Sequence, residues 1–172
     1  LWARVLRRLG GGAVIVRDLR PARGAAGLRF GADVAFDNAA TDPVTAVRRA
    51  TGGAGADIVV EAAGEESSVN LAARLVRERG TIVFFGVPRA PSFVFDYFTF
   101  FRAYATTQTT SGAMLEPGKG SFRLALELIA SGAVDVRGMV THRIPFAALE
   151  RGYDLARTGA DGAVKVVVTM PA

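Results

Sequence analysis

Asp18 is the residue whose position says most about chemistry in this sequence. It closely follows an apolar run, residues 13–16, that is expected to form a buried strand. In dinucleotide-binding units an acidic side chain at such a strand end accepts hydrogen bonds from the adenosine ribose, and its charge repels a 2′-phosphate. Asp18 therefore favours a site for NAD over one for NADP, although three arginines lie nearby in the sequence. The alternative role of Asp18 is to cap the helix expected from Pro21.

The glycine-rich loop that binds the pyrophosphate should precede this acid by about 20 residues, which places it before Leu1. The glycines at residues 10–12 do not fit that loop, because they end a helix expected over residues 1–9 and lead into a strand. The phosphate-binding loop runs in the opposite order, from a strand into a helix. We therefore expect the sequence to start one strand late, inside a longer parent protein.

Helical and extended segments alternate from there on. Helices are expected over residues 21–30, 41–50 and 65–77, and strands over residues 34–36, 57–61 and 81–85. Because these strands are apolar along their whole length, we expect both of their faces to be buried under helices. The fold class is therefore α/β, a doubly wound parallel sheet of the Rossmann type that lacks its first strand, with a small C-terminal α+β extension.

The pattern changes after Pro88. Residues 93–101 are dense in aromatics and are expected to form a helix packed in the core or against another subunit, with a membrane or partner surface as the alternative. A strand is expected over residues 103–109, helices over 121–131 and 146–157, and a closing strand over 164–169. We expect residues 1–110 to form a truncated NAD-binding Rossmann domain and residues 111–172 to form an extension that belongs to a catalytic domain.

Composition excludes several classes of function. The net charge of +5 comes from arginines scattered over helical segments, which favours solvated helix faces and no nucleic-acid partner. The chain has no cysteine and one histidine, so no metal site is expected within it. No apolar run is long enough for a membrane helix, and the start does not resemble a signal peptide. We expect a cytoplasmic protein with no membrane partner.

Five segments together resemble a known family. Residues 14–18, 30–33, 55–64, 80–88 and 140–146 look like the C-terminal half of the zinc-containing medium-chain alcohol and polyol dehydrogenases. The resemblance covers essentially the whole chain. It implies an NAD-dependent oxidoreductase that transfers hydride between NAD and a small-molecule alcohol or polyol. It also implies a homo-oligomeric parent and a zinc ion whose ligands lie in a catalytic domain outside this chain, so no catalytic or metal-binding residue is expected here.

The resemblance also implies cofactor-binding roles. Asp18 matches the ribose-binding acid, Arg23 a basic residue beside the same ribose, and Lys165 a residue that reaches the pyrophosphate. Ala62, Ala63 and Gly64 match a turn close to the cofactor, and Phe85, Gly86 and Val87 match the turn that meets the nicotinamide carboxamide. Taken alone, these residues could equally be an exposed helix arginine, an exposed strand lysine and ordinary turns. His142 is expected to be structural, and no role is assigned to residues 107–110.

Two other interpretations remain. One is a zinc-free quinone or enoyl reductase of the same superfamily that uses NADPH, against which Asp18 argues. The other is an inactive nucleotide-binding fragment. A doubly wound sheet places its first strand between the second and the fourth, so loss of that strand leaves two interior edges unpaired. We therefore expect the chain by itself to be unstable or prone to aggregation.

Overall fold

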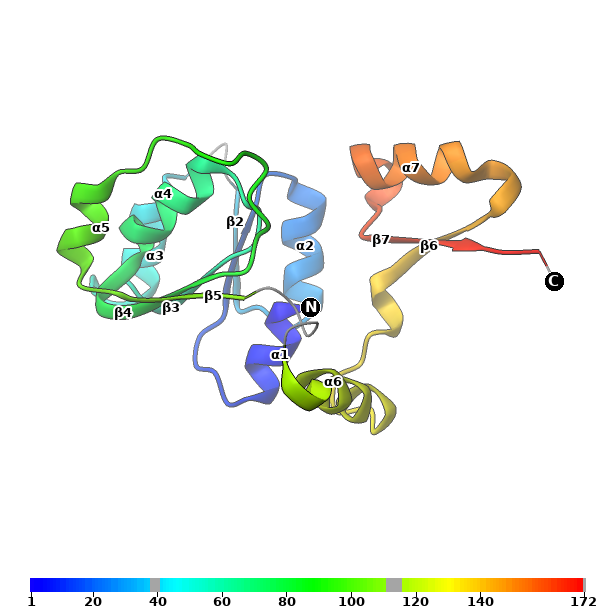
Figure 1. The fold of residues 1–172 in the computed structure, drawn as a ribbon, viewed down its shortest axis with the longest axis horizontal. Coiled ribbons are helices and arrows are strands. Elements are labelled where there is room, and N and C mark those ends of the chain that lie inside the picture. The colour runs from blue at the N-terminus through cyan, green and yellow to red at the C-terminus, as the bar shows by residue number, and fades with distance from the viewer. Residues whose placement is uncertain (38–40, 111–115, 172) are drawn as a thin grey trace. The chain divides into compact units, whose positions relative to one another are not determined.

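Helices and strands alternate along the chain in the computed structural model, which describes residues 1–37, 41–110 and 116–171 (Figure 1). The elements gather into two units. Unit 1 comprises Leu1–Ala40 and Arg123–Ala172, and unit 2 comprises Thr41–Phe122. No helix in the described ranges is both long enough and apolar enough to cross a membrane.

Unit 1 begins with two helices and two strands in alternation: α1 (Trp2–Arg8), β1 (Ile15–Asp18), α2 (Pro21–Arg29) and β2 (Val34–Asp37). The two strands are parallel neighbours, with Asp18 opposite Asp37. Helix α2 starts with proline, which suits a first helical turn because an N–H there would have no intrahelical partner. The helix packs so closely on β1 that a Cβ added to Gly27 would lie 2.5 Å from Val16 Cγ2.

The C-terminal part of unit 1 holds a second strand–helix–strand motif. After α6 (Gly120–Ala130), which starts within unit 2, the chain forms β6 (Val140–Pro145), α7 (Leu149–Thr158) and β7 (Lys165–Thr169). Strands β6 and β7 are parallel, and α7 packs on both. Short 3-10 turns lie at Pro117–Lys119, Arg137–Met139, Phe146–Ala148 and Ala160–Gly162.

Unit 2 contains α3 (Pro43–Ala50), β3 (Ala56–Glu61), α4 (Glu66–Leu75), β4 (Val76–Phe84), α5 (Tyr97–Ala103) and β5 (Thr106–Thr109). Its strands form one parallel sheet in the order β3-β4-β5. Helix α4 packs against β3 and β4, and α5 packs against α4 and β4, so these helices lie together on the sheet (Figure 1). Asp42 and Asp96 start α3 and α5 by accepting hydrogen bonds from the backbone N–H groups of Thr45 and Thr99.

The core of each unit is small. In unit 2 the buried cluster consists of Ala72, Ala73, Val76 and Ile82, and Ile82 is completely inaccessible. In unit 1 one buried cluster consists of Ala3, Val14 and Ala32, and another of Ile144, Leu155 and Ala163. Alanine supplies much of this buried surface, so each core gains little from the hydrophobic effect per residue.

The fold class predicted from the sequence is confirmed as an α/β fold with parallel strands, and the boundaries differ by a few residues. Strand β1 ends at Asp18 itself. Helix α5 begins at Tyr97, because Asp96 caps it, and the aromatic residues before Asp96 are not helical. Strand β4 starts five residues early, at Val76, and strand β6 was not expected at all. The proposed boundary between residues 110 and 111 falls beside residues 111–115, which lie outside the described ranges.

The prediction that the strands are buried on both faces is wrong for this chain. Ile58 in the middle of β3 is 56% exposed, and every residue of β5 is exposed. Within the described ranges β3 has a hydrogen-bonded neighbour only in β4, and β5 only in β4, so both are also edge strands of their sheet. No described ladder joins β1 to β3, the two strands that would flank a first strand of a doubly wound sheet.

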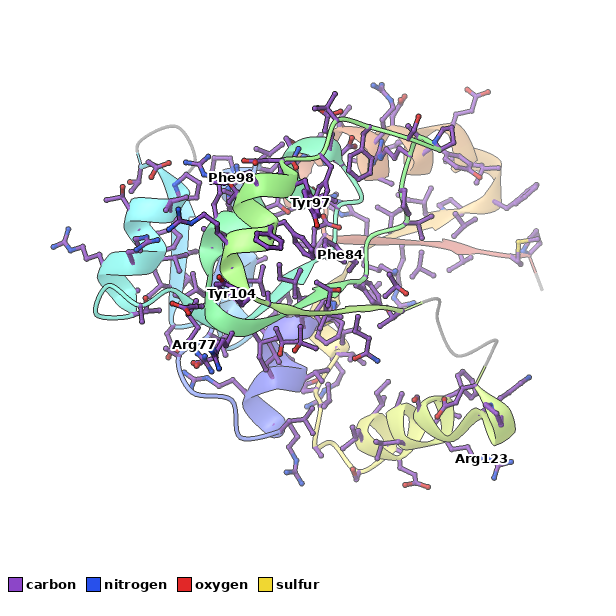
Figure 2. The ribbon with its side chains drawn as sticks, turned by 60° about the vertical axis from the view of Figure 1, so that its left-hand side comes forward. Arg77, Phe84, Tyr97, Phe98, Tyr104 and Arg123 are labelled. Atoms are coloured by element: carbon purple, nitrogen blue, oxygen red, sulfur yellow. The ribbon has the colours of Figure 1, made fainter. Side chains whose placement is uncertain are left out.

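The aromatic segment is also less buried than a core helix would be. Phe100 packs against the buried cluster of unit 2. Tyr97, Phe98 and Phe101 are 63%, 69% and 56% exposed, and Figure 2 shows Tyr97 and Phe98 on α5. The expected packing in the core therefore holds for only part of the segment, and packing against another subunit stays a prediction.

Candidate functional site

Asp18 and Arg23 are brought together at the end of β1. The Oδ1 atom of Asp18 accepts a hydrogen bond of 2.9 Å from the backbone N–H of Arg20, and Oδ2 lies 3.9 Å from Arg23 Nη1. The carboxylate is partly exposed, with 35% of its side-chain surface accessible. Arg20 is the residue that precedes α2, and the start of that helix has no side-chain cap among the described residues, so Asp18 holds the turn before α2 and does not cap the helix. The ribose-binding role of Asp18 stays a prediction.

Lys165 and His142 lie on the C-terminal pair of strands in unit 1. Lys165 is the exposed first residue of β7, and its carbonyl accepts a hydrogen bond of 3.2 Å from Thr141 Oγ1. The ring of His142 on β6 is partly buried, and its Nδ1 lies 3.0 Å from the same hydroxyl. These contacts assign no ligand to either residue. The role of Lys165 at a pyrophosphate stays a prediction.

In unit 2 the structure brings two predicted cofactor turns into direct contact. We call residues 61–64 and residues 85–87, which follow the neighbouring strands β3 and β4, the paired turns. The backbone N–H groups of Phe85 and Gly86 donate to the carbonyl of Glu61 over 2.8 and 2.9 Å. The N–H of Arg89 donates to the carbonyl of Gly64 over 3.3 Å. Both turns lie at the carboxyl ends of parallel strands, where open α/β sheets bind their ligands.

Two glycines make this contact possible. A Cβ on Gly64 would lie 2.0 Å from the carbonyl oxygen of Val87, and its φ of +71° favours glycine. A Cβ on Gly86 would lie 2.3 Å from the backbone nitrogen of Gly64. The resemblance implies that the turn of Gly86 meets the nicotinamide, and the structure shows this turn packed closely against the other turn. The contact of the turns with a cofactor stays a prediction.

Glu61 joins the paired turns and was missed by the sequence reasoning. Its side chain is only 4% exposed, and it is the one buried charged or polar residue in the described ranges. Oε1 accepts hydrogen bonds from the N–H of Ala63 over 2.7 Å, the N–H of Gly64 over 3.0 Å and the hydroxyl of Ser68 over 2.8 Å. Oε2 is buried without a hydrogen-bond partner among the described residues. The sequence pattern that could have found Glu61 is an acid at the end of an apolar strand. The same pattern points to Asp18.

The side chains whose pKa values are shifted lie at helix caps and in one surface ion pair. Arg137 donates side-chain and backbone hydrogen bonds to Asp135 and lowers the pKa of that carboxyl to about 2. Hydrogen bonds from the backbone and side chain of Thr45 hold the pKa of Asp42 below its usual range. These carboxylates stay ionised at neutral pH and stabilise local turns.

The described residues offer no metal site. No group of three or more histidine, cysteine, aspartate or glutamate side chains within them is placed to hold an ion. Since the chain also lacks cysteine altogether, the donor set of a thiolate zinc site cannot come from it. We therefore derive no step through a metal for this chain.

The chain is a Rossmann-like α/β protein, because its parallel strands are joined by helical crossovers and by turns at the carboxyl ends of the strands. The family is identified by sequence. The chain belongs to the zinc-binding dehydrogenases, whose family model matches residues 1–131. The resemblance to the C-terminal part of zinc-containing medium-chain dehydrogenases is thereby confirmed.

Three known proteins illustrate the similarity. An L-threonine 3-dehydrogenase from Bacillus velezensis is 26% identical over 164 residues, which are 95% of this chain and 46% of that protein. The alcohol dehydrogenase from Thermus sp. ATN1 has a TM-score of 0.86 at 28% identity, with 98% of this chain and 48% of that chain covered. A Sinorhizobium meliloti structure assigned to the zinc-binding dehydrogenases and bound to NADP has a TM-score of 0.79 at 26% identity, with 96% and 47% covered. The chain thus spans about half the length of the curated relatives it matches.

Proposed function

We propose that this chain is the cofactor-binding part of an oxidoreductase that transfers hydride between NAD and an alcohol or polyol. The observation that carries the proposal is Asp18, a partly exposed carboxylate at the carboxyl end of β1 in a chain of the zinc-binding dehydrogenase family. The proposal includes a longer, cytoplasmic and homo-oligomeric parent protein. Residues 1–110 would form its cofactor domain and residues 111–172 a return into its catalytic domain.

The predicted cofactor residues of each unit would have their own roles. In unit 1, Asp18 would accept hydrogen bonds from the adenosine ribose, Arg23 would lie beside that ribose, and Lys165 would neutralise pyrophosphate charge. In unit 2, the paired turns would hold the nicotinamide: residues 62–64 would pass close to it, and the backbone of residues 85–87 would orient its carboxamide. The nicotinamide would supply the hydride chemistry when bound, and the residues of this chain would orient it.

The choice of NAD over NADP rests on charge. The carboxylate of Asp18 would repel a 2′-phosphate and leave it without a hydrogen-bond donor. A reductase that uses NADPH is the second candidate, because a similar structure from Sinorhizobium meliloti binds NADP and because Arg23 lies only 3.9 Å from Asp18. An arginine in that position could pair with a phosphate if the carboxylate were turned away.

The test is the cofactor preference of the full-length protein. We expect NADH to bind more tightly than NADPH by titration calorimetry. Asp18→Asn should weaken NADH by about 10- to 100-fold, the range for losing charged hydrogen bonds. Asp154→Asn is the matched control, because it removes an exposed carboxylate of α7 whose one ion pair within the described ranges is with Arg157. Oxidation of a panel of alcohols and polyols with NAD, before and after zinc removal by a chelator, tests the reaction. Tighter binding of NADPH by the unchanged protein would favour the reductase and overturn the proposal.

A further inference from the structure

Glu61 combines burial with an unusual set of contacts. It ends strand β3 with a side chain that is 4% exposed. Its Oε1 accepts three hydrogen bonds from residues 63, 64 and 68, while its main-chain carbonyl accepts two from residues 85 and 86. One residue therefore determines the path of both paired turns, one through its carboxylate and the other through its carbonyl.

A burial this deep is unfavourable for a carboxylate unless its oxygens find donors. Oε1 is well supplied, but Oε2 is buried without a partner in the described part of the chain, 2.7 Å from where a Cβ of Gly86 would stand. An apolar side chain would suit such a position better for stability alone. The carboxylate instead accepts hydrogen bonds from the backbone N–H groups of Ala63 and Gly64. It thereby fixes a turn that lies between β3 and α4 and is not held by the hydrogen bonds of either element.

The paired turns leave no room for adjustment. Because a Cβ on Gly64 or on Gly86 would meet backbone atoms of the opposite turn at 2.0 and 2.3 Å, a shift of one turn displaces the other. Ser68 ties the same carboxylate to the first turn of α4 through a hydrogen bond of 2.8 Å. Strand β3, helix α4 and the turn after β4 thus converge on one residue, Glu61.

We infer that Glu61 is a positioning residue for the nicotinamide end of the cofactor: its carboxylate holds the paired turns in the geometry that receives the nicotinamide. The inference rests on the proposed function. It assigns Glu61 no contact with the cofactor, since its oxygens face protein atoms. It predicts separate effects on the two ends of the dinucleotide, because the adenosine end is assigned to Asp18.

The experiment compares two ligands in the full-length protein, NADH and ADP-ribose, which lacks the nicotinamide. Glu61→Leu removes both acceptor oxygens and puts an apolar side chain of similar length in their place. We expect this variant to bind NADH about 10-fold more weakly, because it loses a charged hydrogen-bond network. Its affinity for ADP-ribose should fall by less than about twofold. Glu61→Gln keeps one oxygen for the three donors, so its NADH affinity should return to within about threefold of the unchanged protein.

Ser68→Ala provides a second variant if Glu61→Leu does not fold. It removes one donor to Oε1 and also the contacts of Ser68 Oγ with the backbone of Glu65 at the start of α4, so its melting temperature is measured beside its binding. We expect a smaller loss of about threefold that is again confined to NADH binding. Equal losses for NADH and ADP-ribose, together with a lower melting temperature, would reduce Glu61 to a structural residue and overturn the inference. Unchanged NADH binding in Glu61→Leu would overturn it as well. Failure of the unchanged protein to bind either ligand would instead overturn the proposed function and the inference together.

Discussion

At the scale of single residues, two acids at strand ends have different surroundings. Asp18 ends β1 with 35% of its side chain exposed, whereas Glu61 ends β3 and is 4% exposed. An exposed carboxylate can exchange water for the hydroxyls of a ligand. A buried one has already exchanged water for backbone donors, so it acts on the shape of the protein. The same residue type therefore supports two proposals, contact with the ribose for Asp18 and positioning of the turns for Glu61.

The surface pair of Asp135 and Arg137 gives a prediction at this scale. Arg137 lowers the pKa of Asp135 from 3.8 to about 2 in the folded chain. A depressed folded pKa stabilises the fold above the unfolded value, and this contribution is lost as the pH falls toward 2. Carboxyl NMR titration should show Arg137→Gln returning the pKa of Asp135 toward 3.8. The difference in unfolding midpoint between the two proteins should be present at pH 5 and absent below pH 2. An unchanged titration in the variant would contradict the assignment.

At the scale of elements, the contact between the paired turns depends on glycine. Gly64 has a positive φ and faces the carbonyl of Val87, so two separate penalties act on any substitution there. Other glycines with positive φ face open space, for example Gly52 after α3. Comparing Gly64 with Gly52 therefore separates the effect of backbone conformation on stability from the effect of close packing.

Gly64→Ala should lower the free energy of unfolding by about 2 to 5 kcal/mol, the sum of a left-handed backbone penalty and a steric clash. Gly52→Ala is the matched control, because its φ of +61° is similar and no atom lies within 4 Å of the added Cβ. The Gly52→Ala variant should lose only about 1 to 2 kcal/mol of its free energy of unfolding. Urea unfolding of the full-length protein measures both values. Equal losses would show that the turns do not press on each other.

The helices and strands were largely predictable, because each is encoded by local patterns such as apolar periodicity, Pro21 at a helix start and glycines at turns. Strand β6 was missed because its sequence, which mixes polar and apolar residues and includes Arg143, has no continuous apolar run. The candidate turns could be placed from the resemblance, but the contact between them could not. It joins residues more than 20 positions apart and has no local signature.

At the scale of the whole molecule, the chain has little strand pairing and little buried apolar surface to stabilise its fold. Its described strands form three separate sheets of two, three and two strands. Large apolar side chains such as Ile58 and Phe98 are more than half exposed. Each backbone group buried without a partner costs about 1–3 kcal/mol, against a usual domain stability of about 5–15 kcal/mol. Unpaired strand edges also invite pairing with other chains.

We therefore expect residues 1–172, produced alone, to aggregate or to melt without a cooperative transition. Light scattering and a thermal melt with and without NADH measure this, and the full-length protein serves as the control. A single cooperative transition that NADH raises by several degrees would contradict the expectation. In that case the sheets described here would be sufficient for folding and cofactor binding.

The sequence by itself determined the class of fold, the order of the elements, the family and the candidate acid Asp18, because periodicity, turn residues and short motifs are local properties of a chain. The tertiary structure alone decided which turns meet and that Glu61 is buried beside them. It also decided that Ile58 and three aromatic residues of α5 are exposed, namely Tyr97, Phe98 and Phe101. Those properties depend on which strands pair and on what covers each face. Pairing and burial are set by contacts between distant parts of the chain, which no local pattern encodes.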